Sequence, residues 1–263
     1  MKDQTIKNQR VMKENSQVRI IQKLRKNNQM KCQELDLQTQ LSTGVRFFDM
    51  ELKTGIIDKT ILYVKIGNIF KYVKFTDVLN TFKVFLNEQK LEILLLRLTP
   101  DTNAVHLVKK LLSEDTYVWM EPNIPSVSQV RGKIVLLQSS TFHLGIASGV
   151  TFTFHNGKPK EEQLPENLSQ AGKYCASHLV ITDTSTTNIF DVPEKVAEKF
   201  NKVIGKHLEE LLHDSNGPSC LGVIAMDFPN QEIIKKIIAF NLRGAAKSSS
   251  KMHKERHEAR NSD

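Results

Sequence analysis

The feature that most constrains the fold is a repeated alternation of short apolar segments with longer amphipathic ones. Apolar runs of strand length occupy 93–98, 133–137, 179–182 and 221–226. Runs of this kind are typical of strands that are buried on both faces of a sheet. Apolar residues at helical spacing predict helices between and after these strands, over 76–87, 102–113, 193–212 and 231–240. Such alternation predicts an α/β fold whose parallel sheet is closed into a barrel or doubly wound.

The rest of the chain divides into a folded domain and two basic ends. Residues 45–51 alternate like a half-buried strand, and 61–64 form another short apolar run. The segment 138–177 is polar and contains Gly and Pro, so we expect hairpins or a long loop there. We predict one barrel domain over 11–243, preceded by a basic arm over 1–10 and followed by a basic, disordered tail over 244–263.

The barrel rule for ligand sites selects a first set of candidate residues. In a parallel α/β barrel, the site lies at the carboxyl ends of the strands. Applied to the predicted strands, this rule selects the following residues: Asp49, Glu51, Lys65, Ile66, Thr99, Gln138, Ser139 and Asp227.

Six segments of the chain carry a resemblance to a known family. Residues 41–51, LSTGVRFFDME, are similar to the "QL..G.R.FDIR" strand of phosphatidylinositol-specific phospholipase C X domains. Residues 61–68, ILYVKIGN, resemble the "LY..HG" strand end of that family, and the helix 75–86 resembles the one that follows it. The remaining three segments resemble later strands of the family, and they are 92–98, 131–137 (RGKIVLL) and 221–229 (LGVIAMDFP). In order, the six segments make the chain resemble this family over about residues 11–241.

The resemblance implies a fold and a chemistry. The implied fold is a distorted TIM-type (β/α) barrel, the PLC-like phosphodiesterase fold, in a single domain. Active members use one histidine to take the proton from the inositol 2-hydroxyl and a second to protonate the departing diacylglycerol oxygen. Both groups must titrate near neutrality, which suits imidazole. An arginine or a calcium ion offsets the charge of the phosphoryl oxygens.

The family's catalytic positions are occupied by other residues in this chain. The first histidine falls on Glu14 and its aspartate neighbour on Asn15, while the second histidine falls on Ile66. The arginine of the FDIR strand falls on Glu51. The family's further basic positions fall on Thr99 and Ser139, which we place with Lys65 at the ligand rim. The chain retains Asp49 and Asp227.

These substitutions predict a catalytically impaired relative, a pseudoenzyme that keeps a cleft for a phosphoinositide or for a protein partner. Losing a general acid or a general base each costs about 10²- to 10⁴-fold in rate. The alternative is an active phosphoric diester hydrolase that cleaves phosphatidylinositol with the help of Ca²⁺. Asn15, Asp49 and Glu51 would supply oxygen ligands to that ion. We expect His143 and His155 at the surface, not as replacement catalysts.

Charge and cysteine content suggest an environment and a partner class. The formal net charge is +8, and lysines and arginines crowd both ends of the chain. Such ends are either solvated arms or are attracted to an anionic membrane surface, at about 1 kcal/mol for each basic residue. No aromatic residues interleave with the basic ones, which argues against nucleic acid, and no apolar run is long enough to span a membrane. The first thirty residues lack the apolar segment of a secretory signal, and Cys32, Cys175 and Cys220 have no metal spacing. We therefore expect reduced thiols and a cytoplasmic or peripheral membrane location.

Overall fold

A computed structural model describes residues 35–66, 69–153, 160–175, 177–184, 193–218 and 220–242. Its strands are β1 (Phe47–Thr54), β2 (Leu62–Ile66), β3 (Ile69–Lys74), β4 (Leu94–Pro100), β5 (Val118–Trp119), β6 (Ile134–Leu137), β7 (Val150–Phe152), β8 (Val180–Asp183) and β9 (Val223–Ala225). Its helices are α2 (Leu37–Thr43), α3 (Phe75–Glu88), α4 (Val105–Ser113), the short 3-10 helix Val127–Gln129, α5 (Lys160–Tyr174), α6 (Pro193–His213) and a last helix over 231–242.

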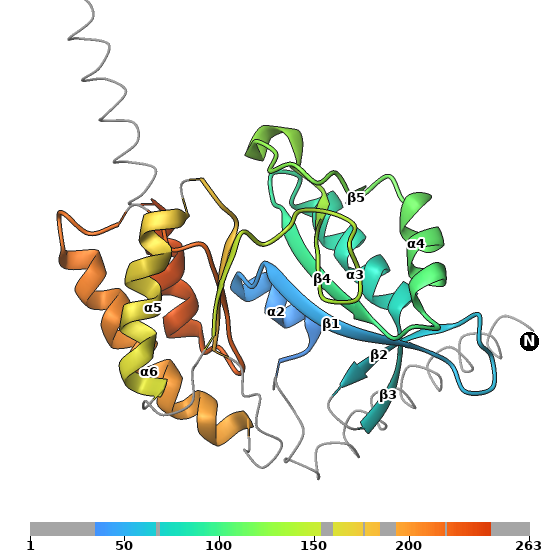
Figure 1. Ribbon diagram of the computed structural model, residues 1–263, viewed down its shortest axis with the longest axis horizontal. Coiled ribbons are helices and arrows are strands. Elements are labelled where there is room, and N and C mark those ends of the chain that lie inside the picture. Colours follow the sequence, from blue (N-terminus) through green and yellow to red (C-terminus); the bar gives the residue numbers. More distant parts are fainter. Residues whose placement is uncertain are drawn as a thin grey trace, which may run out of the picture.

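The described strands form two sheets that lie side by side (Figure 1). The first has the order β3-β2-β1-β4-β6-β5, and the second has the order β7-β8-β9. Strands β1, β4, β6 and β5 are parallel, as are all three strands of the second sheet, which confirms the predicted parallel core. An isolated parallel bridge between Leu137 and Ile146 continues the pairing beyond β6.

The hairpin of β1, β2 and β3 departs from the predicted parallel pattern. Both β1–β2 and β2–β3 are antiparallel pairs. The connection between Thr54 and Leu62 is short, and parallel neighbours need a crossover of a dozen or more residues. The chain between these strands can therefore form only an antiparallel turn.

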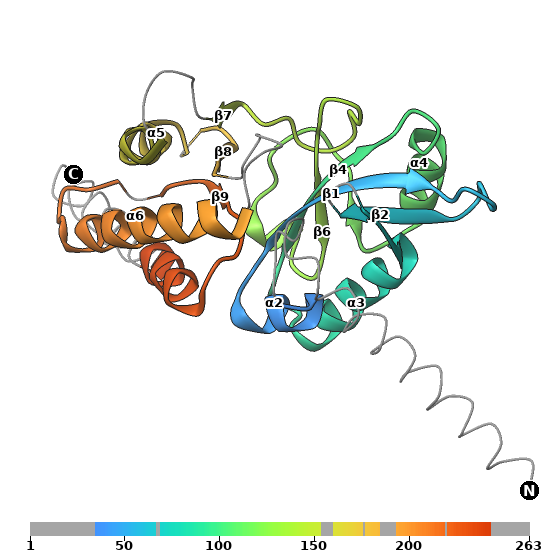
Figure 2. The same ribbon diagram turned by 90° about the horizontal axis from the view of Figure 1, so that it is seen from below.

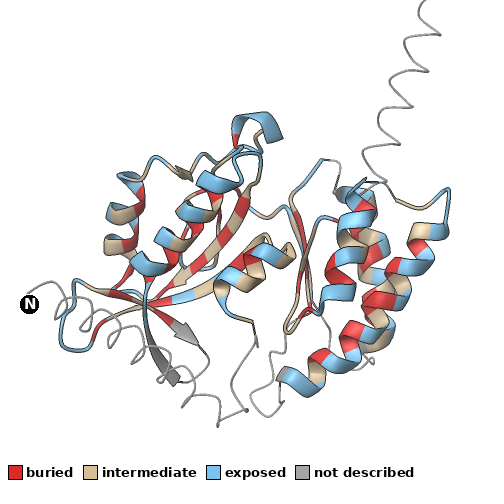
Figure 3. Ribbon diagram, turned by 180° about the vertical axis from the view of Figure 1, so that it is seen from behind, coloured by how far each residue is buried: buried red, intermediate tan, exposed pale blue. Residues whose placement is uncertain are grey.

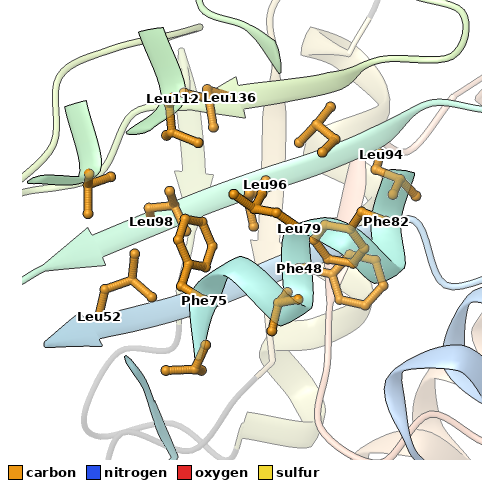
Figure 4. Close-up of a cluster of buried hydrophobic side chains, with 14 of the residues drawn as sticks. Phe48, Leu52, Phe75, Leu79, Phe82, Leu94, Leu96, Leu98, Leu112 and Leu136 are labelled. Carbon is orange, nitrogen blue, oxygen red and sulfur yellow. The ribbon is translucent and has the colours of Figure 1, made fainter. Parts of the chain in front are cut away.

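The outer face of the first sheet packs against α3 and α4. Strand β4 alternates strictly between buried and half-buried residues, and its buried leucines meet the apolar stripe of α3 (Figure 4). The rings of Phe48 and Phe82 lie 4.8 Å apart at the centre of this contact. Buried residues lie on the inward faces of the elements, while exposed residues cover the outer faces of the helices (Figure 3).

The opposite faces of the two sheets share an interior core. One cluster of buried residues joins Val135 and Leu137 of the first sheet to Ile181 and Ala225 of the second. The partly buried Phe47 and Leu95 pack against the same cluster. Side chains from alternate positions of parallel strands that fill a common interior are typical of a (β/α) barrel.

The prediction of hairpins or a long loop over 138–177 is wrong for Lys160–Tyr174, which form helix α5. The helix contains Pro165, a residue that normally ends a helical prediction. It is nevertheless an amphipathic helix, because Leu164, Leu168 and Ala171 all lie on one face and are fully buried. Burial of that face against the second sheet and α6 outweighs the lost backbone hydrogen bond.

A disulfide contradicts the prediction that all cysteines are reduced. Cys175, just after α5, is bonded to Cys220, just before β9, with a Cα–Cα distance of 6.0 Å. The two residues are 45 positions apart, so their proximity depends on the fold and not on local spacing. Disulfides persist in oxidising compartments, and the cysteines therefore no longer support a cytoplasmic location.

Removal of this disulfide should lower stability measurably. We expect the Cys175→Ser/Cys220→Ser variant to lose about 4 kcal/mol of unfolding free energy, because the unfolded chain regains the entropy of a loop of this length. Denaturant unfolding of the oxidised proteins measures the difference. Cys32→Ser is the control for the loss of a thiol that does not take part in this disulfide. Equal stability of the double variant and the wild type would contradict the assignment.

Candidate functional site

The interior of the barrel changes from apolar to charged toward the carboxyl ends of β1 and β4. On β1, Phe47 faces the apolar core and Asp49 follows two residues later on the same face. On β4, Leu95 faces that core and is followed in the same way by Arg97. Asp49 and Arg97 are direct neighbours in the parallel register of the two strands. The polar end of the barrel interior therefore begins with an opposite charge pair.

Arg97 is held by two carboxylates that come from different sheets. Its Nη2 donates to Oδ2 of Asp49 at 2.5 Å and to Oδ2 of Asp183, at the end of β8, at 3.2 Å. The guanidinium also lies 5.6 Å from the centroid of the Phe47 ring. One cation on β4 therefore joins β1 to the end of β8, and it connects the two sheets across the barrel mouth.

The electrostatics of the trio formed by Arg97, Asp49 and Asp183 favour the charged guanidinium. The hydrogen bond to Asp49 raises the pKa of Arg97, burial opposes this effect, and the charges of Asp49 and Asp183 add to it. The side chain of Arg97 is only 16% exposed, so the pair with Asp49 lies in a region that is only partly screened by water. Two carboxylates against one guanidinium leave the trio with a net negative charge.

Asp49 and Arg97 of this trio line an open cleft of about 420 Å³. The residues that line it are Asp49, Arg97, Thr99, Gln138, Ser139, Ser140, Ala147 and Ser148. The residues around the charge pair therefore carry mostly hydroxyl and amide groups. Such groups can accept and donate hydrogen bonds to a polar ligand.

The serine side of the cleft belongs to a tightly held loop that follows β6. The Ser139 hydroxyl accepts from the backbone N–H groups of Thr141 and Phe142, and the Gln138 side chain donates to the carbonyl of Gly145. Gly145 has φ of 90°, and a Cβ there would lie 2.2 Å from the carbonyl oxygen of Leu136. Only glycine allows the loop to approach β6 this closely, which keeps Ser139 at the rim.

The structure brings together part of the predicted site. Asp49, Thr99 and Ser139 all line the cleft, together with Gln138. Glu51 is an exposed residue of β1 that pairs in register with Lys65 and Thr99 but is not among the lining residues.

The other predicted site residues lie elsewhere or outside the description. Asp227 follows β9 and does not line the cleft. Ile66 ends β2, and its backbone pairs with Ile69. Glu14 and Asn15 lie outside the described residues, as does His155. His143 is exposed, as expected.

Arg97 and Asp183 are the site residues that sequence reasoning missed. The segment 93–98 was predicted as a continuous apolar strand, but Arg97 interrupts it. A charged residue within a strand that is buried on both faces must find a counter-charge, because an unpaired buried charge is costly. That principle could have selected Arg97. Asp183 gives no such indication, since only the fold places it beside a residue 86 positions away.

The described donors do not fit a calcium site. Within the described ranges, no three His, Cys, Asp or Glu side chains are grouped so that they could hold a metal ion. Calcium takes six to eight oxygen ligands. Here the two carboxylates that converge in the mouth are already bound by the Arg97 guanidinium.

The chain is similar in sequence to a known bacterial phosphodiesterase. No protein-family profile matches the chain. The chain is 26% identical over 236 residues to the 1-phosphatidylinositol phosphodiesterase of Listeria monocytogenes, an alignment that covers 80% of this chain and 72% of that protein. The chain is a homologue of bacterial phosphatidylinositol-specific phospholipase C.

Solved structures of these phospholipases confirm the predicted fold of the homologue. The Listeria monocytogenes enzyme superposes with a TM-score of 0.66 at 22% identity, covering 80% of this chain and 84% of that one. A structure of the S. aureus enzyme gives a TM-score of 0.60 at 16% identity, with coverage of 80% and 86%. The chain therefore has the TIM-type barrel fold of the phospholipase C homologues, in agreement with the shared interior core.

Removing the Arg97 charge should destabilise this homologue in a pH-dependent way. The Arg97→Met variant leaves Asp49 and Asp183 without their common cation, and we expect a loss of about 1–3 kcal/mol at neutral pH. The loss should shrink at acid pH, because protonation of carboxylates removes the charges that the guanidinium offsets. Denaturant unfolding at the two pH values measures it.

The exposed Arg131 provides the control, since Arg131→Met removes the same charge from the surface. That variant should remain close to wild type at both pH values. A loss for Arg97→Met that is equal at low and neutral pH would contradict the electrostatic role of the trio.

Proposed function

We propose that this phospholipase C homologue binds a ligand in its barrel mouth and cleaves phosphodiesters poorly or not at all. The observation that carries the proposal is the double ion pair of Arg97 with Asp49 and Asp183. A cation that is already shared by two carboxylates has little charge left for the phosphoryl oxygens of a substrate. Offsetting that phosphoryl charge is a large part of catalysis in phosphoryl transfer.

The residues that would move protons support the same proposal. By resemblance, the two histidine positions are taken by Glu14 and Ile66. An alkyl side chain can neither give nor take a proton, and no histidine of the described part of the chain lines the cleft. Without a general acid on the side of the leaving group, departure of diacylglycerol from the phosphate would be slow.

The lining of the cleft supports a binding role. Its hydroxyl and amide groups suit a ligand with many hydroxyl groups, such as the inositol ring of a phosphoinositide head group. The net negative charge of the trio opposes the phosphate of such a ligand, which would have to lie toward the rim. A protein partner that covers the mouth is the other ligand consistent with this lining.

The homologue should release almost no inositol phosphate from phosphatidylinositol vesicles. We expect a rate at least about 10⁴-fold below that of the Listeria monocytogenes enzyme, because two proton-transfer groups and an available cation are replaced. Release of radiolabelled inositol phosphate measures the rate, with the Listeria enzyme as positive control. Turnover comparable to that enzyme would contradict the proposal.

The calcium-dependent alternative requires its own measurement. If Arg97 keeps the two carboxylates of the mouth engaged, added Ca²⁺ should not raise the release of inositol phosphate. The assay is run with Ca²⁺ and with a chelator, on the wild type and on Asp49→Asn. Calcium-stimulated activity that Asp49→Asn abolishes would establish the alternative and overturn the proposal.

A further inference from the structure

One residue has an unusual backbone conformation where the chain leaves β9. Phe228 has φ of 45°, and within the described ranges no other non-glycine residue has a positive φ. A bulky residue rarely adopts this left-handed region, because its Cβ then lies too close to the backbone carbonyl oxygen. Pro229 adds a second restriction, since the residue before a proline is normally extended. Strain of this kind persists only where the surroundings hold it, and it is concentrated at functional sites.

The strained residue is held by Asn201 of α6. This helix packs between α5 and the last helix (Figure 2). The Asn201 Nδ2 donates to the carbonyl oxygen of Phe228 at 2.7 Å, and the residue is only 8% exposed. Its Oδ1 is also buried and has no hydrogen-bond partner among the described residues. An unpaired buried oxygen is costly, so the bond to Phe228 is kept at the expense of stability elsewhere in the same side chain.

The residue before Phe228 is a carboxylate that faces the barrel mouth. Met226 packs against the cluster beneath α6, whereas Ala225 lies in the interior core. Because side chains alternate along an extended chain, Asp227 follows Ala225 on the interior side. Ala225 pairs in register with Asp183, which belongs to the charged trio. Asp227 therefore lies at the same carboxyl end of the barrel as the trio, next to the cleft but not in its lining.

The chain is fixed on both sides of this carboxylate. The carbonyl oxygen of Ala225 accepts from the backbone N–H of Thr184 at 2.8 Å and from its hydroxyl at 3.0 Å. The side-chain oxygen of Asn230 caps the last helix. A change of φ at Phe228 must be absorbed within the few residues 226–229 between these two anchors. Such a change would therefore move the carboxylate that precedes Phe228.

We propose that Asn201 is a positioning residue of the barrel mouth, which holds Phe228 in the left-handed region and thereby directs Asp227 toward a ligand. A bond that only joins α6 to β9 needs no strained acceptor, since the carbonyl of an extended residue accepts equally well. The strain instead determines the direction of the chain, and with it the direction of the carboxylate. The part that Asp227 plays toward a ligand rests on the proposed binding function, whereas its position depends on α6 and β9 alone.

NMR of the Asp227 carboxyl carbon tests the positioning. Asn201→Leu removes the donor and nearly keeps the volume, so the Asp227 resonance should shift. In the same variant, the backbone coupling that reports φ of Phe228 should leave the left-handed range. Adding Phe228→Gly should return the Asp227 resonance toward its wild-type position, because glycine adopts a positive φ without strain. Adding Phe228→Ala should not, because alanine keeps the Cβ.

His207→Leu is the matched control. His207 lies on the same helix, its side chain is 16% exposed, and its Nε2 is likewise buried without a partner among the described residues. This variant should leave the Asp227 resonance in place. The inference is overturned if Asn201→Leu does not shift that resonance, if His207→Leu shifts it equally, or if glycine and alanine at position 228 act alike.

A variant that does not fold is read in the same way. If Asn201→Leu is unfolded, Phe228→Gly should restore folding and Phe228→Ala should not. Loss of folding in both double variants would overturn the inference, as would its recovery in both.

Calorimetric titration of myo-inositol separates this inference from the proposed function. The wild type should bind, Asn201→Leu should bind about tenfold more weakly, and Phe228→Gly should restore most of the affinity. Absence of binding to all of these proteins would contradict the proposed function, while the NMR results still decide the positioning. Equal affinity of the wild type and Asn201→Leu, despite a shifted Asp227 resonance, would overturn the role of Asp227 toward the ligand.

Discussion

The ion pairs of Arg97 with Asp49 and Asp183 are the interaction on which the mouth of this barrel depends. Below them, the interior is filled by apolar side chains from both sheets. Above them, the cleft is lined by hydroxyl and amide groups. A guanidinium at this level can be buried only with counter-charges, and Asp49 of β1 and Asp183 at the end of β8 supply them. The same contacts that close the core therefore determine the charge of the cleft.

The proposed loss of catalysis is compatible with retention of the fold. The strands and helices that build a barrel depend on apolar periodicity, which the chain keeps. The chemistry of a phosphodiesterase depends on a few polar groups at the strand ends, which can change without disturbing that periodicity. An arginine bound by two carboxylates contributes to structure, while an arginine that contacts phosphate contributes to catalysis. In this account, Glu51 replaces the family's phosphate-contacting arginine, and Arg97 has the structural role.

The sequence predicted most strands and helices because their apolar residues follow the period of each element. It missed α5, because Pro165 lies inside an otherwise amphipathic helix. It missed the antiparallel β1–β2 pair, because the apolar pattern of a strand does not state the direction of its neighbour. It also missed the Cys175–Cys220 disulfide, because sequence spacing gives no distance between residues in different elements.

For the candidate site, the sequence predicted only which strand ends contribute residues, and not how their side chains contact one another. The barrel rule selected Asp49, Thr99 and Ser139, which the structure brings into one cleft. It could not select Asp183, whose role depends on the approach of β8 to β4. The sequence also did not predict that Ile56 and Ile57 are exposed, because an apolar pair beside a glycine could equally belong to a buried strand.

The most direct test of the central claim is calorimetric titration of inositol 1-phosphate into the wild type and into Asp49→Asn/Asp183→Asn. If the two carboxylates occupy Arg97, their neutralisation frees the guanidinium, and the variant should bind the phosphate at least about tenfold more tightly. Wild-type affinity equal to or higher than that of the variant would show that Arg97 is already available to phosphate, and it would contradict the account.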